Sequence, residues 1–183
     1  SRWFEDGENL HSIRTTRVAP ADLNAFLYQM ERNIADIAAA LGECGTAAEF
    51  EAAAARRRAA IHALMWDGER GRWEDLLLEE EGSGSGGGVW TAARSSRGVY
   101  ASSFAPLWCG CAADEAQAAA ACRGLRDSGL LKPGGVATSL SASGQQWDGD
   151  NGWPCLQSMI VEGLRRHAGA EGRKLADSIA QRW

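Results

Sequence analysis

Apolar residues recur along the chain mainly at the three- and four-residue steps of an α-helix. The clearest stretch covers residues 22–41, where these steps alternate through Leu23, Leu27, Met30, Ile34, Ile37 and Leu41. Residues at this spacing share one face of a helix, and Pro20 just ahead of the stretch suits a helix entry. The pattern predicts one long amphipathic helix.

Further helices are predicted from the same periodicity and from start and stop signals. Thr46 and Glu49 have the spacing of a capping box, so a second helix is expected from Thr46 to about Met65. Later segments with helical patterns cover residues 114–126, 153–167 and 171–183. Alternation typical of strands is brief and limited to residues 71–75 and 135–140. The sequence therefore predicts a series of helices joined by loops.

Two segments invite a comparison with phosphate-binding sites. Residues 79–88 are rich in glycine and serine, but they lack the Gly-Lys-Ser/Thr ending of a phosphate-binding loop. Arg56, Arg57 and Arg58 occupy consecutive helical positions, which point about 100° apart and form no single patch. We expect a flexible surface insertion at 79–88 and a solvated helix face at the three arginines.

Composition restricts the partners of the chain. Its 183 residues suit one domain, and the formal net charge of -5 lacks the basic excess that nucleic acids or anionic membranes require. No run of about 18 apolar residues could span a bilayer, and the first ten residues have no secretory-signal pattern. We expect neither a nucleic-acid partner nor a membrane-spanning segment, and localisation is undetermined.

Cysteine and histidine spacing indicates no metal and no cofactor. The five cysteines are scattered, which favours neither a disulfide framework nor a CxxC metal pair. The three histidines, His11, His62 and His167, lie far apart in the sequence, without partners at metal-binding or triad spacing. A calcium loop beginning at Asp148 is also excluded, because its twelfth position is Met159 and not glutamate.

The segment 145–153 combines indole, amide and carboxylate side chains. Sugar sites use such sets, because indole faces stack on apolar ring hydrogens while amides and carboxylates bind hydroxyls. In a simpler interpretation, Asn151 caps the next helix, Pro154 lies in the first turn of that helix, and Trp147 and Trp153 are buried in the core. The residue types alone do not decide between a sugar site and a helix cap with buried tryptophans.

Several motifs in order resemble the trehalase family. Gly144-Gln145-Gln146-Trp147-Asp148, then Asn151-Gly152-Trp153 and Leu156-Gln157, resemble the signature that trehalases carry late in their catalytic domain. The start of the chain resembles the end of the family's Gly-Trp-Asp-aromatic-Ser-Ser-Arg-Trp motif. The remaining matches are Ile13-Arg14-Thr15-Thr16, 20–27, Trp66-Asp67, Gly71, Trp73, 104–108 and Thr138-Ser139-Leu140.

The resemblance implies an all-α fold, an (α/α)6 toroid of helical hairpins, of which residues 1–183 would form about half. This partial trehalase catalytic domain would carry the Gly/Ser-rich insertion at 79–88. Because only about half of the helices needed to close the toroid would be present, some apolar helix faces would be left unpaired. This polypeptide is therefore expected either to aggregate on its own or to be a piece of a longer product.

The same resemblance implies hydrolysis of the disaccharide trehalose to two glucose molecules with inversion. It places the family's catalytic acid just upstream of Ser1 and its base beyond Trp183, so no catalytic residue is expected in this chain. The residues expected to bind substrate are Gln145, Gln146, Trp147, Asp148, Asn151, Trp153, Arg2 and Trp3. Asp150 and Pro154-Cys155 depart from the family signature.

Two alternatives remain. The chain could be a non-catalytic carbohydrate-binding or interaction fragment that keeps the motif loops without chemistry. Less favoured is a different toroidal glycosidase in which Asp148, beside Trp147, acts as a substitute acid.

Overall fold

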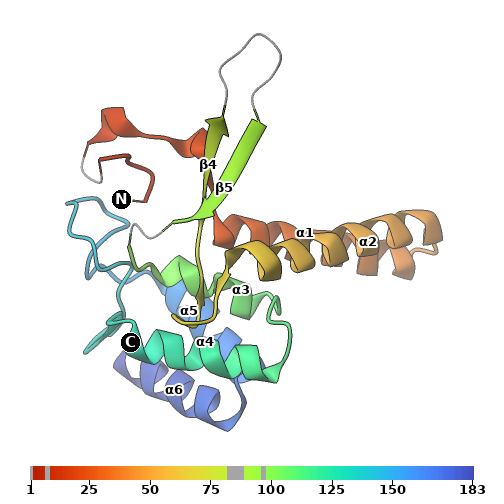
Figure 1. The fold of residues 1–183 in the computed structure, drawn as a ribbon. Coiled ribbons are helices and arrows are strands. Elements are labelled where there is room, and N and C mark those ends of the chain that lie inside the picture. The colour runs from red at the N-terminus through yellow and green to blue at the C-terminus, as the bar shows by residue number, and fades with distance from the viewer. Residues whose placement is uncertain (1, 7–8, 82–88, 96–97) are drawn as a thin grey trace.

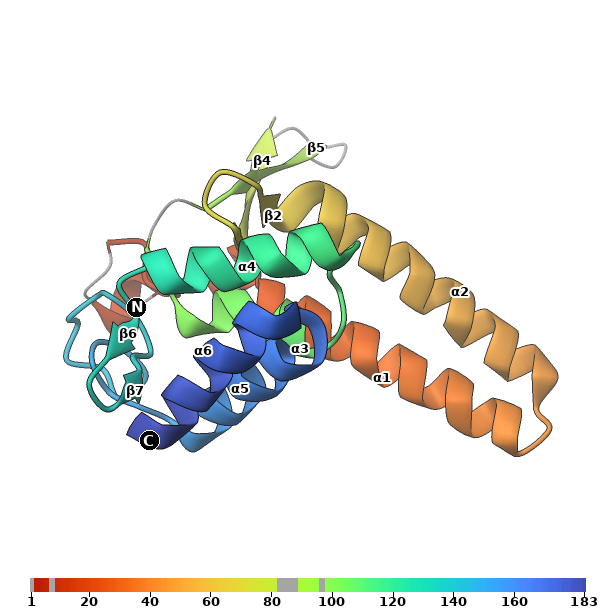
Figure 2. The same cartoon turned by 90° about the horizontal axis from the view of Figure 1, so that it is seen from below.

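The computed structural model describes residues 2–6, 9–81, 89–95 and 98–183. Helices dominate this part of the chain: α1 (Ala21–Ala40), α2 (Cys44–Ala60), α3 (Ala105–Trp108), α4 (Glu115–Asp127), α5 (Pro154–His167) and α6 (Gly169–Arg182). The fold is built around two helical hairpins, α1 with α2 and α5 with α6 (Figures 1 and 2). Among the described residues, no helix combines the length and apolar content needed to cross a bilayer.

Short antiparallel strands connect the helical hairpins. The largest sheet has the order β1 (Val18–Ala19), β4 (Leu76–Glu81), β5 (Val89–Arg94). Two smaller ladders pair β2 (Trp66–Asp67) with β3 (Arg72–Trp73) and β6 (Leu131–Lys132) with β7 (Gly135–Val136). The strands β3 and β7 lie within the predicted strand segments 71–75 and 135–140, but each is only two residues long.

The β4–β5 hairpin has no counterpart in the sequence prediction. Leu76, Leu77 and Leu78 form a continuous apolar run without the alternation that marks a strand with one solvated face. Glu79–Glu81, the first residues of the expected insertion, continue β4 and pair with β5. Residues 82–88, the rest of that insertion, lie outside the described residues.

The predicted helix at 22–41 is confirmed by α1, but its packing face differs from the apolar stripe. The α1–α2 hairpin projects from the rest of the molecule (Figure 2). Apart from Glu31, the buried positions of α1 are alanines, with Ala25 0% and Ala38 6% exposed, whereas Met30 is 49% and Ile37 61% exposed. Small side chains allow the alanine-rich α2 to approach closely, so the larger apolar residues face outward.

The start of α2 differs from the capping-box prediction, which is wrong. The helix begins at Cys44, its N-cap is Glu43, and no side chain makes a capping hydrogen bond. Thr46 and Glu49 therefore lie inside the first turns. The predicted end at Met65 agrees with the structure, because a π-helical turn at Ile61–Met65 extends α2.

The three arginines of α2 have different environments, so the expectation of a uniformly solvated face is wrong. Arg56 is exposed, but Arg57 donates from Nε and Nη2 to the buried carboxylate of Glu31 in α1, at 2.8–3.0 Å. Arg58 donates to the carbonyl of Ala112. Charge-assisted pairing explains how a carboxylate only 8% exposed is tolerated between α1 and α2.

The main core lies where α3 and α4 pack against the α5–α6 hairpin. Its largest fully buried side chains include Trp73, Phe104, Leu107, Leu125, Leu164 and Ile179. A Cβ at Gly163 would lie 2.9 Å from the backbone nitrogen of Trp108. Glycine is therefore needed in α5 to let α3 pack directly against it.

The outward stripe of α1 predicts association of the isolated chain. Replacing Met30 and Ile37 by lysine should make residues 1–183 more nearly monodisperse, because contiguous exposed apolar surface drives self-association. We expect little loss of stability, within about 0.5 kcal/mol, since both side chains already face solvent. Light scattering after size-exclusion chromatography measures the first effect and urea unfolding the second.

The control is Ala38→Lys, which places one lysine on the buried face of α1. It should destabilise the chain without improving its solution behaviour. A monodisperse unsubstituted chain would show that the stripe does not drive association.

Candidate functional site

A cavity of about 650 Å³ opens between the N-terminal segment and the loop that precedes α5. This volume lies within the range of small-molecule sites. Five parts of the chain contribute: the N-terminal segment, the first turn of α1, the turn before α3, the 138–148 segment and α5. The lining residues are Arg2, Trp3, Phe4, Leu10, Ile13, Thr15, Asp22, Tyr100, Ser102, Thr138, Gln145, Gln146, Trp147, Asp148 and Leu156.

The structure brings most of the residues selected from the sequence to this cavity. Arg2, Trp3 and the segment from Gln145 to Asp148 line it, although they are far apart in the sequence. Asn151 and Trp153 do not line it and instead support the lining loop. Five polar lining residues were not selected from the sequence: Thr15, Asp22, Tyr100, Ser102 and Thr138. Three of them, Thr15, Asp22 and Thr138, belong to motifs already matched to the family, so membership in those motifs could have identified them.

Two tryptophans form a parallel stack at the cavity wall. The rings of Trp147 and Trp153 have centroids 4.1 Å apart and an interplanar angle of 2°. Trp147 is 50% exposed, so the reading that it fills the core is wrong. Trp153 lies behind it and donates from Nε1 to the carbonyl of Gln146 at 3.1 Å. Trp147 therefore presents one indole face on a rigid support.

Asn151 closes the loop and does not cap α5. Its side-chain amide donates to the carbonyls of Gln146, at 3.2 Å, and Asp148, at 2.9 Å. The N-cap position of α5 belongs to Trp153, which makes no side-chain capping bond, so the cap prediction for Asn151 is wrong. Pro154 occupies the first turn of α5 as predicted, where no backbone donor is needed.

Asp148 is an anchor of the loop as well as a lining residue. It is only 4% exposed, and Oδ1 accepts from the hydroxyl of Ser139 at 3.1 Å while Oδ2 accepts from Ser143. The Ser139 hydroxyl also accepts from the backbone amides of Ser141 and Gly149. These contacts tie the two ends of the loop together and favour a positional role over that of a substitute acid.

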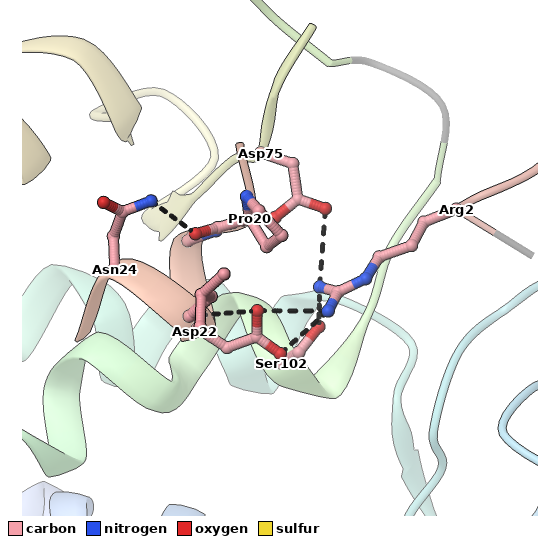
Figure 3. A network of polar contacts seen from close by, with 8 residues as sticks. Arg2, Pro20, Asp22, Asn24, Asp75 and Ser102 are labelled. Atoms are coloured by element: carbon pink, nitrogen blue, oxygen red, sulfur yellow. Dashed lines mark hydrogen bonds and ion pairs between the residues drawn. The ribbon is translucent and has the colours of Figure 1, made fainter. Parts of the chain in front are cut away.

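Arg2 is the centre of a partly buried polar network at the cavity wall (Figure 3). Nη2 donates to both carboxylate oxygens of Asp22, at 3.0 and 2.9 Å, and Nη1 donates to the Ser102 hydroxyl at 2.9 Å. Asp75 lies 3.4 Å from Nη1. The guanidinium also lies over the ring of Trp3, 4.6 Å from its centroid. Side-chain exposure is 16% for Arg2, 17% for Asp22 and 11% for Asp75.

The charges in this network shift the protonation equilibria of its members. Burial acts to lower the pKa of Arg2, but the negative charges of Asp22 and Asp75 outweigh it and the pKa is raised. Burial raises the pKa of Asp75, with Arg2 acting in the opposite direction. Burial likewise raises the pKa of Tyr100. At neutral pH Arg2 therefore stays charged and the Tyr100 hydroxyl stays a neutral donor.

Gln157 in α5 holds the strand that leads into the lining segment. Its Oε1 accepts from the backbone N–H of Val136 at 2.9 Å, and its Nε2 donates to the Val136 carbonyl at 2.6 Å. Both residues are buried, with Gln157 3% exposed. Only a side chain with an acceptor and a donor side by side satisfies both groups.

The side chains that line the cavity can stack on a ring and form hydrogen bonds. No group of three or more His, Cys, Asp or Glu among those residues is arranged to hold a metal ion. The cavity combines an indole face with amides, hydroxyls, a guanidinium and two carboxylates. This combination suits a polyhydroxylated ring with apolar faces.

Comparisons with known proteins agree with this description. The family model described as trehalase matches residues 1–183. A probable trehalase of Oryza sativa subsp. japonica is 40% identical over 190 residues, covering 100% of this chain and 34% of that protein. The trehalase of Arabidopsis thaliana is 39% identical over 184 residues, covering 100% of this chain and 29% of that protein. The chain thus spans about a third of the length of these curated relatives.

A solved structure supports the fold. The neutral trehalase of Saccharomyces cerevisiae matches with a TM-score of 0.67 and 26% identity, covering 91% of this chain and 31% of that one. The expected fold class, part of an (α/α)6 toroid of helical hairpins, is confirmed by this match.

The Gln157 clamp gives a prediction for stability. Gln157→Glu removes the donor to Val136 and places carboxylate oxygens near that carbonyl, so the free energy of unfolding should fall by about 1–3 kcal/mol. Urea unfolding in the Met30→Lys, Ile37→Lys background measures the change. Gln181→Glu, the same substitution at an exposed position of α6, should have almost no effect. Equal effects of the two substitutions would contradict the role of the clamp.

Proposed function

Since the chain belongs to the trehalase family, we propose that it forms part of the catalytic domain of an enzyme that hydrolyses trehalose to two glucose molecules. The observation that carries this proposal is the cavity in which Arg2, Trp3 and the 145–148 loop meet. Its volume suits a disaccharide, and its wall supplies one aromatic face surrounded by polar groups.

The wall residues have complementary proposed roles. Trp147 would stack on the apolar face of a glucose ring, because its own far face is already covered by Trp153. The amides of Gln145 and Gln146 would bind hydroxyls, since each offers a donor and an acceptor. Arg2 and Trp3 would form the opposite wall. Asp148, Asn151 and Trp153, also selected from the sequence, would keep the loop in shape.

The proton-transfer pair is proposed to lie in parts of the parent protein outside residues 1–183. An inverting glycosidase needs an acid and a base about 6.5–9.5 Å apart, with room for a water molecule between them. The carboxylates that line this cavity, Asp22 and Asp148, are engaged by Arg2 and by serine hydroxyls respectively. Such contacts suit the holding of a pocket wall better than the transfer of protons.

The exposed stripe of α1 fits the same proposal. In a toroid, each helical hairpin packs against its neighbours, and the outward side chains of Met30 and Ile37 would be covered by helices of the parent enzyme. Residues 1–183 are therefore proposed to be one part of a single catalytic domain, with residues 79–88 as a surface insertion in it.

The function is tested on the full-length gene product. We expect it to release glucose from trehalose, and proton NMR of the first turnovers should show α- and β-glucose in equal amounts. Inversion converts one of the two α-linked residues to the β anomer and leaves the other unchanged. Trehalose binding without glucose release would instead support a non-catalytic carbohydrate-binding protein, and α-glucose alone would contradict inversion.

The role of the indole face gives a second prediction for the same enzyme. Trp147→Ala should raise KM for trehalose about tenfold, the loss expected for about 1.4 kcal/mol of stacking and apolar contact. Trp147→Phe should recover most of the affinity, because it keeps an aromatic face. Trp90→Ala, at an equally exposed indole on β5, is the control. If Trp147→Ala and Trp90→Ala have the same KM, the sugar does not stack on Trp147.

A further inference from the structure

Asp75 belongs to the Arg2 network but does not line the cavity. It lies between β3 and β4 in the sequence and contacts two groups, one at the start of α1 and the other, Arg2, in the N-terminal segment. Figure 3 shows its side chain beside Arg2. Oδ1 accepts from the backbone N–H of Ala21, the first residue of α1, at 2.8 Å. Oδ2 lies 3.4 Å from Nη1 of Arg2. Arg2 and its other partners, Asp22 and Ser102, all line the cavity.

Only a carboxylate satisfies both neighbours of Asp75. The N–H of Ala21 and the guanidinium of Arg2 are donors, and a carboxylate has acceptors on both sides. The side-chain amide of asparagine has an acceptor oxygen on one side and a donor NH2 on the other, so its NH2 would face one of these two donors. Because the preceding residue, Pro20, provides no side-chain cap for α1, Asp75 supplies this contact from 54 residues away.

Burial makes the arrangement of Arg2 hard to change. Asp75 is shielded from water and faces Arg2 as its counter-charge and Asp22 as a second carboxylate. If the guanidinium turned away, two nearly buried carboxylates would be left without a cation, which is strongly unfavourable. The pair of carboxylates thus restricts Arg2 to one orientation.

We propose that Asp75 is a positioning residue that acts through Arg2: by holding the guanidinium from behind, it fixes Arg2, Asp22 and Ser102 in the arrangement that binds substrate. It has no contact with substrate itself. This inference rests on the proposed function, because it assigns a role in binding at that same site.

A double-mutant cycle in the full-length enzyme tests the proposal. Asp75→Asn should raise KM for trehalose about tenfold, as expected for the loss of one charge-assisted contact of about 1.4 kcal/mol. In an Arg2→Met background, the same substitution should change KM less than about twofold, because the group through which Asp75 acts is gone. For variants too slow to assay, the Kd of trehalose from tryptophan fluorescence replaces KM.

A purely structural role would give another result. If Asp75 only caps α1, Asp75→Asn should have the same effect on KM with and without Arg2, and this additivity would overturn the proposal. Should Asp75→Asn fail to fold, the cycle is run with Asp75→Glu, which keeps both acceptors but displaces them. Its effect on KM should also disappear in the Arg2→Met background.

Two controls distinguish failure of this inference from failure of the proposed function. Asp177→Asn, at an exposed ion pair with Arg165, applies the same chemical change elsewhere and should leave KM unchanged. The unsubstituted enzyme tests the proposed function by itself, since absence of glucose release overturns that function together with this inference. An active enzyme with an additive cycle overturns the inference alone.

Discussion

The guanidinium of Arg2 bonds to three parts of the chain that are distant in the sequence. Through Asp22 it meets the start of α1, through Asp75 the segment after β3, and through Ser102 the turn before α3. A cation that bonds in several directions at once defines a geometry more strictly than apolar contacts do. The cavity wall on this side depends on that one side chain.

The opposite wall is rigid although it contains no regular secondary structure. The 144–153 loop directs Asn151, the Trp153 indole and the Asp148 carboxylate inward, onto its own backbone and onto two serines. These bonds replace the ladder of a helix or strand. Gln145, Gln146 and Trp147 are thereby left free to face the cavity, and the parallel stack on Trp153 keeps the Trp147 ring in place.

Much of the helical plan could be predicted from the sequence, because periodicity is a local property. The same periodicity does not say which face of a helix is covered, and in α1 the alanines pack while Met30 and Ile37 face outward. The role of Asn151 was mispredicted for a related reason: an asparagine before a helix is a frequent cap, and only the folded loop shows that carbonyls within it take the amide. Arg57 was expected in solvent because its partner, Glu31, lies on another helix.

The site residues that belong to sequence motifs could be predicted. Those that depend on contacts between distant parts of the chain could not. The segment from Gln145 to Asp148 and the pair Arg2 and Trp3 were selected from the sequence and line one cavity. Asp75 was not selected, because its significance arises from contacts with Ala21 and Arg2, which are distant in the sequence. No local pattern marks a residue of this kind.

The central claim, that these two walls enclose a sugar site, is tested most directly by a crystal structure of the full-length protein with trehalose or an unreactive analogue. We expect a glucose ring on the open face of Trp147, with hydroxyls within hydrogen-bond distance of Gln145 or Gln146 and with the Arg2–Asp22 pair intact. A sugar bound elsewhere, with this cavity filled only by water, would contradict it.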